Sequence, residues 1–201
     1  FPAVMAVLVG WFFIIFGAGE PLVNLSYDIP FVIRQPVVPQ EVVIVYMDEE
    51  SHRALGQQPR FDRWDRRLHA QLIDRLRAAG AKTIVFDIWF DEPGDPAADD
   101  ALIRAVRAHG HVGVAGVVGN VTFNRRTVGT EPIRPFPGLQ DAAAFWGMVE
   151  LPDGEGIVRR HYQGDFNIPS LAWKAASLVR SNLPALERPR WLTYYGPPGA
   201  L

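Results

Sequence analysis

The sequence contains no cysteine, which excludes disulfide bonds, thiolate metal ligands and a cysteine nucleophile. It also lacks a long basic run, and its formal net charge of −2 is close to balanced. Nucleic-acid binding depends on a basic patch that neutralises phosphates, so nucleic acid is not an expected partner. The sequence has no P-loop, no His-Glu-x-x-His pair, no Gly-x-Ser-x-Gly elbow and no protein-kinase motif set. We therefore do not expect an enzyme.

Charged residues are also missing from the apolar run Phe1–Gly19. As a helix with a rise of about 1.5 Å per residue it would extend for roughly 28 Å, near the ~30 Å thickness of bilayer hydrocarbon. A secretory signal peptide has a shorter apolar core and a basic lead, and no lead or cleavage site is visible here. We predict one transmembrane helix over residues 1–20, in contact with membrane lipid. A signal sequence and a buried core helix are the alternatives.

The next segment, residues 21–40, mixes apolar residues with prolines and is predicted to be a membrane-proximal connector with a short helix around 23–27. From residue 41 onward, strand-like and helix-like patterns alternate. This order predicts that residues 41–201 form an α/β domain with a mainly parallel sheet, flanking helices and an antiparallel hairpin. The predicted strands are 41–47, 82–90, 111–119 and 190–196, and the predicted helices are 62–80, 96–110 and 169–181.

Two further segments complete this prediction. Residues 120–144 are rich in proline, glycine and polar residues, and we expect a long loop that is functional or mobile. Residues 145–163 flank a Pro-Asp-Gly-Glu-Gly turn and predict the antiparallel hairpin. In the predicted helix 62–80, Asp62 is the expected N-cap, and the face that carries Arg66 and Arg67 is expected to be solvated.

Carboxylates gather where two of the predicted strands end. Asp48 follows the first strand, and Asp87 lies near the end of the second. Adjacent parallel strands deliver their carboxyl ends to the same edge of a sheet, where ligands of open α/β sheets bind. The loops above this edge supply three more candidates: Glu49, Asp91 and Glu92.

These carboxylates support two interpretations. Several oxygen ligands at one edge would suit a divalent cation, Mg²⁺ or Ca²⁺, although the spacing lacks the alternation of an EF-hand loop. In the structural interpretation, Asp87 accepts hydrogen bonds from a neighbouring helix N-terminus or from loop amides, and Asp99 caps its own helix. The sequence therefore leaves these residues as candidate ligands and assigns no metal.

Two arginines in the predicted hairpin form a second candidate cluster. Arg159 and Arg160 are adjacent, so in a strand they point to opposite faces. We expect one to pair with an acid of the main sheet and the other to face solvent or a partner. A plain solvated edge strand is the alternative.

The order of these motifs resembles the CHASE2 family of bacterial extracytoplasmic sensor domains. The matching pieces are VVIVYMDEESHRALG, HAQLIDRLRAAGAKTIVFDIWFDEP, DDALIRAVRAHG, MVELPDGEGIVRRHYQ and PSLAWKAAS. The resemblance implies a sensor on the periplasmic side of the bacterial inner membrane, anchored by one N-terminal helix. In the family, further membrane helices and a cytoplasmic output domain normally follow.

Two functions fit this resemblance. The first is a membrane-anchored sensory or ligand-binding domain of a signalling protein. The second is a non-catalytic structural or accessory subunit of a larger membrane complex. Family sensors generally act as dimers, and aromatic residues are dense in the C-terminal part. We therefore expect a homodimer or docking to other membrane proteins.

Overall fold

The computed structural model describes residues 2–15, 19–35, 37, 39–60, 63–123, 126–150, 158–180, 183 and 190–193. The chain divides into two compact units. One unit is Tyr46–Trp191, and the other combines Phe1–Val45 with Leu192–Leu201.

A parallel sheet forms the centre of the unit Tyr46–Trp191. Its strands are β1 (Ile84–Trp89), β2 (Val112–Phe123) and β4 (Phe145–Met148), with the first half of β2 paired in parallel to both β1 and β4. Strand β3 (Arg126–Ile133) pairs antiparallel with the second half of β2. A separate antiparallel pair consists of β5 (Gly164–Asp165) and β6 (Ile168–Pro169). The predicted α/β class with a mainly parallel sheet is confirmed.

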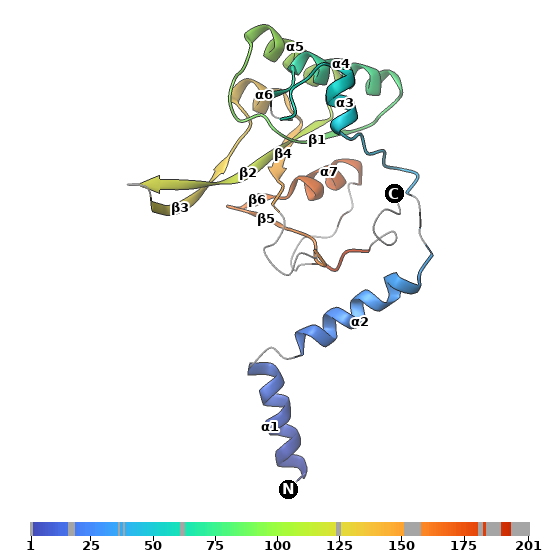
Figure 1. Cartoon of the computed structure of the whole chain (residues 1–201), viewed down its shortest axis with the longest axis vertical. Coiled ribbons are helices and arrows are strands. Elements are labelled where there is room, and N and C mark those ends of the chain that lie inside the picture. The colour runs from blue at the N-terminus through green and yellow to red at the C-terminus, as the bar shows by residue number, and fades with distance from the viewer. Residues whose placement is uncertain are drawn as a thin grey trace. The chain divides into compact units, whose positions relative to one another are not determined.

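Helices cover both faces of this sheet (Figure 1). On one face lie α4 (Arg66–Ala78), α5 (Pro96–His109) and α6 (Pro137–Ala142), whose apolar side chains pack on β1 and β2. On the other face α7 (Leu171–Val179) packs against β4 and β2. A shorter helix, α3, spans Glu49–Ala54. The buried core consists mainly of aliphatic residues and phenylalanines; its most deeply buried members are Ile73, Leu102, Val106, Val112, Val114 and Leu139.

The helix boundaries follow local capping chemistry. Asp65 accepts a hydrogen bond from the Arg67 amide and starts α4, so the N-cap lies three residues after the predicted Asp62, which is outside the described residues. Asp95 caps α5 in the same way. Gly110 ends α5 with a left-handed φ of 79°, a conformation that favours glycine because it has no Cβ.

One close approach depends on a glycine. A Cβ built on Gly147 in β4 would stand 2.6 Å from the backbone nitrogen of Leu171, where α7 begins. This position brings α7 directly onto the sheet. The small residues of β2 have a similar role, because the ring of Phe145 lies over Gly113.

The predicted strand 41–47 is not part of this sheet. No backbone pairing is found for residues 42–47, and Val43 and Tyr46 are 84% and 68% exposed. Strand β1 is the edge of the sheet and pairs with β2 among the described strands. The β-branched composition of the segment favours a strand only when a partner strand supplies hydrogen bonds, because β-propensity depends strongly on context.

The antiparallel hairpin lies elsewhere than predicted. The expected hairpin over residues 145–163 has its turn, residues 151–157, outside the described residues, and its first strand pairs in parallel with β2. The longer observed hairpin is β2–β3, which pairs residues 117–123 with 126–133 and so lies largely in the segment 120–144 that was predicted to be a loop. Because nearly all of β3 is exposed, it needs no apolar face, and its sequence shows no strand periodicity.

Two helices occupy the N-terminal part of the other unit. Helix α1 spans Pro2–Ile15, and α2 spans Glu20–Ile33, which is longer than the short helix predicted there. Glu20 and Pro21 favour a helix start at this position, because an acid in the first turn and a proline at the first helical positions are both favourable. Within the described part of the chain, no helix combines the length and the apolarity that crossing a bilayer requires. The predicted transmembrane helix over residues 1–20 is therefore not found: α1 is 14 residues long.

Candidate functional site

The candidate acids Asp48 and Glu49 stabilise a helix. Asp48 is the N-cap of α3 and accepts hydrogen bonds from the amide (2.8 Å) and the hydroxyl (2.6 Å) of Ser51. The Ser51 hydroxyl is the main reason that the pKa of Asp48 is lowered. Glu49 contacts His52 at 3.2 Å and Arg53 at 2.6 Å within the same helix. Both acids are exposed, and these contacts lie within α3 and its N-cap. Each carboxylate is therefore already engaged by its own helix.

The candidate acid Asp87 has a different environment. Its side chain lies on the exposed face of β1, opposite Ile84 and Phe86, which are buried. Partial removal from water raises the pKa of Asp87. Asp91 and Glu92 follow in the exposed loop after β1. In the portion of the chain that the structure describes, no group of three or more His, Asp or Glu side chains is placed to hold a metal ion.

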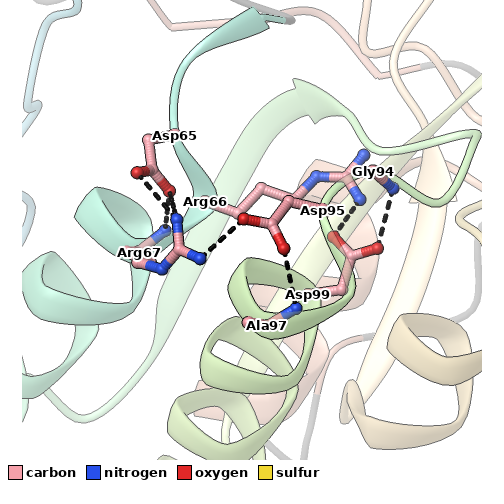
Figure 2. A network of polar contacts seen from close by, with 7 residues as sticks. All are labelled: Asp65, Arg66, Arg67, Gly94, Asp95, Ala97 and Asp99. Carbon is pink, nitrogen blue, oxygen red and sulfur yellow. Dashed lines mark hydrogen bonds and ion pairs between the residues drawn. The ribbon is translucent and has the colours of Figure 1, made fainter.

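The acid that is buried at this end of the sheet is Asp99, in the first turn of α5. It is 6% exposed and forms an ion pair with Arg66 of α4. Its second carboxylate oxygen accepts the Gly94 amide at 2.7 Å. Arg66 also donates to the Glu92 carbonyl at 2.6 Å. We call these four groups the Arg66 clamp; Figure 2 shows Arg66, Gly94 and Asp99 converging.

The clamp is enclosed by aromatic rings as well as by its hydrogen bonds. The Arg66 guanidinium lies 4.8 Å from the ring centroid of Phe136 and 5.5 Å from that of Phe90. Only 13% of the Arg66 side chain is exposed. A planar guanidinium can hydrogen-bond at its edge while its faces contact aromatic rings, which an ammonium cannot do in the same way. The clamp thus holds the acidic loop after β1 down on α4 and α5.

A second, exposed ion-pair chain lies beside the clamp (Figure 2). Arg67 contacts Asp95 at 2.6 Å and Asp65 at 3.2 Å, so the N-caps of α4 and α5 share one arginine. The hydrogen bond from Arg67 is the main cause of the lowered pKa of Asp95. Exposed pairs of this kind contribute little to stability, with a median of about 0–1 kcal/mol. Of the two ion-pair systems, the clamp is therefore the one that fixes the loop.

Sequence reasoning placed Arg66 on a solvated helix face and Asp99 at its own helix cap, and both predictions are wrong. The face that α4 buries carries His69, Ala70 and Ile73, and Arg66 lies on that same face, three, four and seven residues earlier, where it meets Asp99 of α5. Six acids lie between Asp87 and Asp100, and nothing in their spacing distinguishes the buried one. The sequence signal for a buried arginine was the presence of Phe90 and Phe136, whose rings contact the Arg66 guanidinium. These two residues are 4% and 5% exposed.

The predicted arginine pair lies at the boundary of the described residues. Arg160 stacks on the ring of Trp191 at 4.6 Å and forms an isolated antiparallel bridge with the same residue. Arg159 is half-buried. Arg160 is exposed and its described contact is aromatic. The expected pairing of one of these arginines with the acids of the main sheet stays a prediction.

A buried histidine in the core was not singled out from the sequence. His69 of α4 is 4% exposed and lies edge-on to the rings of Phe86 and Phe90, at 5.8 and 5.4 Å. Neither ring nitrogen has a hydrogen-bond partner among the described residues. Burial lowers the pKa of His69 to about 4. His69 is therefore uncharged at neutral pH and packs as an aromatic residue.

One serine–histidine contact resembles part of a nucleophile–base pair. The Ser170 hydroxyl lies 3.3 Å from Nε2 of His161. Ser170 is 2% exposed, however, and its oxygen accepts the Trp173 amide as the N-cap of α7. A buried capping hydroxyl cannot meet a substrate, so the contact orients α7 on the sheet.

The fold and these contacts define a layered α/β domain in which the conspicuous polar network holds a loop in place. The chain matches the family model of the CHASE2 domain over residues 3–196, and it belongs to the CHASE2 family. CHASE2 domains are extracellular sensor domains without catalytic activity. Comparison with curated proteins gave no match, and neither did comparison with solved structures.

Proposed function

We propose that this chain is the sensory part of a membrane-anchored bacterial signalling protein, with the unit Tyr46–Trp191 in the periplasm. The observation that carries this proposal is the match to the CHASE2 domain over nearly the whole chain. In this proposal any catalytic output belongs to other domains, and the α/β unit binds a ligand or responds to a condition of the cell envelope.

The anchoring part of the proposal is supported by the N-terminal residues. The run Phe1–Gly19 has no charged side chain. Helix α1 exposes large apolar residues, including Leu8 (60%) and Trp11 (64%). Large exposed apolar surfaces mark contacts with a membrane or with another protein. We propose that this segment contacts lipid of the inner membrane.

An accessory subunit of a membrane complex is the second candidate, and one observation favours it. Edge strand β1 exposes Val85 (42%) and Trp89 (55%) on the face that α4 and α5 do not cover. Exposed apolar side chains on an edge strand suit docking by another protein or by a second copy of the chain. We propose self-association or binding to another membrane protein on this basis.

The absence of cysteine makes the location directly testable. Thr127 lies in exposed β3, so Thr127→Cys introduces a single accessible thiol. In intact bacterial cells with a permeabilised outer membrane, a maleimide that cannot cross the inner membrane should label this variant. The unsubstituted chain, which has no thiol, is the matched control. Labelling that occurs only after the inner membrane is broken would place β3 in the cytoplasm and refute the proposal.

A further inference from the structure

A hollow of about 460 Å³ lies at the edge of the sheet where β1 and β2 begin. The ends of α4, α5 and α7 surround it. Small-molecule sites typically have volumes of about 300–1,000 Å³. By contrast, the crevice beside Trp89 and Arg134, nearer the other end of the strands, is too tight to admit a water molecule. A small ligand therefore finds room at the amino-terminal edge.

Cationic side chains line one side of this hollow: Arg77 at the end of α4 and Lys82 just before β1. The Lys82 ammonium makes no ion pair or hydrogen bond with the described residues. Among the described residues, Arg77 makes only long contacts, at 3.4 Å to the Ala108 carbonyl and 3.4 Å to an Asp74 oxygen. A guanidinium has five N–H donors, so Arg77 retains donors for a ligand.

Two histidines also line the hollow, and both contact the backbone of neighbouring turns. His109 places Nε2 3.0 Å from the Ala81 carbonyl, and its Nδ1 accepts the His111 amide at 3.2 Å. Both ring nitrogens of His109 are thus used by the backbone. Nδ1 of His111 lies 3.3 Å from the Lys82 carbonyl, which ties the turn before β1 to the turn before β2. The two cations are therefore presented from a hydrogen-bonded frame.

The opposite side of the hollow is apolar. Leu178 and Val179, at the end of α7, line it while remaining 42% and 62% exposed. A ligand that covers them would remove apolar surface from water, which is favourable. The hollow thus offers positive charge on one side and an uncovered aliphatic surface on the other.

We propose that this hollow is a binding site for a small organic anion, whose carboxylate contacts Arg77 and Lys82 and whose apolar body covers Leu178 and Val179. One guanidinium and one ammonium suit a single carboxylate. Because Asp74 already offsets part of the charge of Arg77, a singly charged ligand fits better than a polyphosphate. That such an anion is the sensed signal rests on the proposed function; the binding itself does not.

The test is calorimetric titration of the full chain, purified in mild detergent, with benzoate as the probe carboxylate. Benzamide, its uncharged analogue, is the comparator. We expect saturable benzoate binding and at least about tenfold weaker binding of benzamide, because benzamide lacks the negative charge that strengthens hydrogen bonds to a guanidinium and an ammonium. Lys82→Met and Arg77→Met should each weaken benzoate binding by about tenfold or more on the same grounds.

Arg75→Met and Arg107→Met are the matched controls, since both arginines are exposed on α4 and α5 but do not line the hollow. These variants should bind benzoate as the unsubstituted chain does, and circular dichroism confirms that each variant is folded. The proposal is overturned if benzoate shows no saturable binding, if benzamide binds equally well, or if the controls lose as much affinity as the site variants. Cytoplasmic thiol labelling would refute the periplasmic location and leave the binding result intact, so the two failures are distinguishable.

Discussion

Replacing Asp99 with asparagine should destabilise the domain strongly. Asp99→Asn keeps an oxygen for the Gly94 amide but removes the negative charge that Arg66 faces. Breaking a buried ion pair by removing one partner typically costs about 3–5 kcal/mol, because the other charge stays buried and uncompensated. Since 13% of the Arg66 side chain still reaches water, we expect the lower end, about 3 kcal/mol.

The measurement is urea unfolding of the full chain in mild detergent, followed by circular dichroism. Asp95→Asn is the matched control: it removes the exposed partner of Arg67, yet asparagine caps a helix as well as aspartate does. We expect this control to cost less than about 1 kcal/mol.

A second variant separates the charge from the packing. Arg66→Met with Asp99→Leu replaces the whole ion pair by apolar residues, which is often neutral or stabilising. The double variant should therefore be more stable than Asp99→Asn alone. Equal losses for Asp99→Asn and Asp95→Asn would refute the conclusion that the clamp is the stronger of the two ion-pair systems.

Three further predictions concern the core, the sheet and the acidic residues. Since burial lowers the pKa of His69 to about 4 in the folded chain from 6.5, the unfolded chain binds more protons between these values. Stability should therefore fall by up to about 3 kcal/mol as pH drops through this window, and pH-dependent unfolding of His69→Leu should lack this contribution. Gly147→Ala places a Cβ against the Leu171 backbone and should lower the unfolding free energy by about 3 kcal/mol. Gly129→Ala has open space around it and should change the unfolding free energy by less than about 0.5 kcal/mol. Similar losses of unfolding free energy in the two variants would contradict the packing argument. Because the described residues form no cluster of three metal-ligating side chains, millimolar Mg²⁺ or Ca²⁺ should leave the melting temperature unchanged, whereas a rise that Asp87→Asn abolishes would restore the cation interpretation.

The sequence predicted those elements that have strong periodicity and clear ends. The helix 96–110 is α5 to within one residue, because Asp95 and Gly110 supply a cap and a left-handed stop. The strands 82–90 and 111–119 are β1 and β2, because apolar β-branched runs between helices are typical of a parallel sheet. Local chemistry determines these elements, so local patterns are sufficient to find them.

The remaining elements depend on tertiary context. Strand β3 is solvated on both sides and therefore has no apolar alternation, whereas residues 42–46 have a strand-like composition without a pairing partner. At the candidate site, sequence reasoning expected a buried acid but selected Asp87 in place of Asp99. Which acid is buried depends on the packing of α5 against α4, and a residue pattern within one segment does not contain that information.

The continuity of strand β2 links the exposed hairpin mechanically to the core of the sheet. Its twelve residues are continuous from Val112 to Phe123, a length of about 40 Å at about 3.4 Å per residue. The first half lies between β1 and β4, and the second half forms the exposed hairpin with β3. No loop or hinge separates the two halves. One end of β2 is therefore fixed in the core of the sheet, and the other end is exposed and open to a partner. A partner that bends or twists the hairpin would apply torque directly to the centre of the sheet.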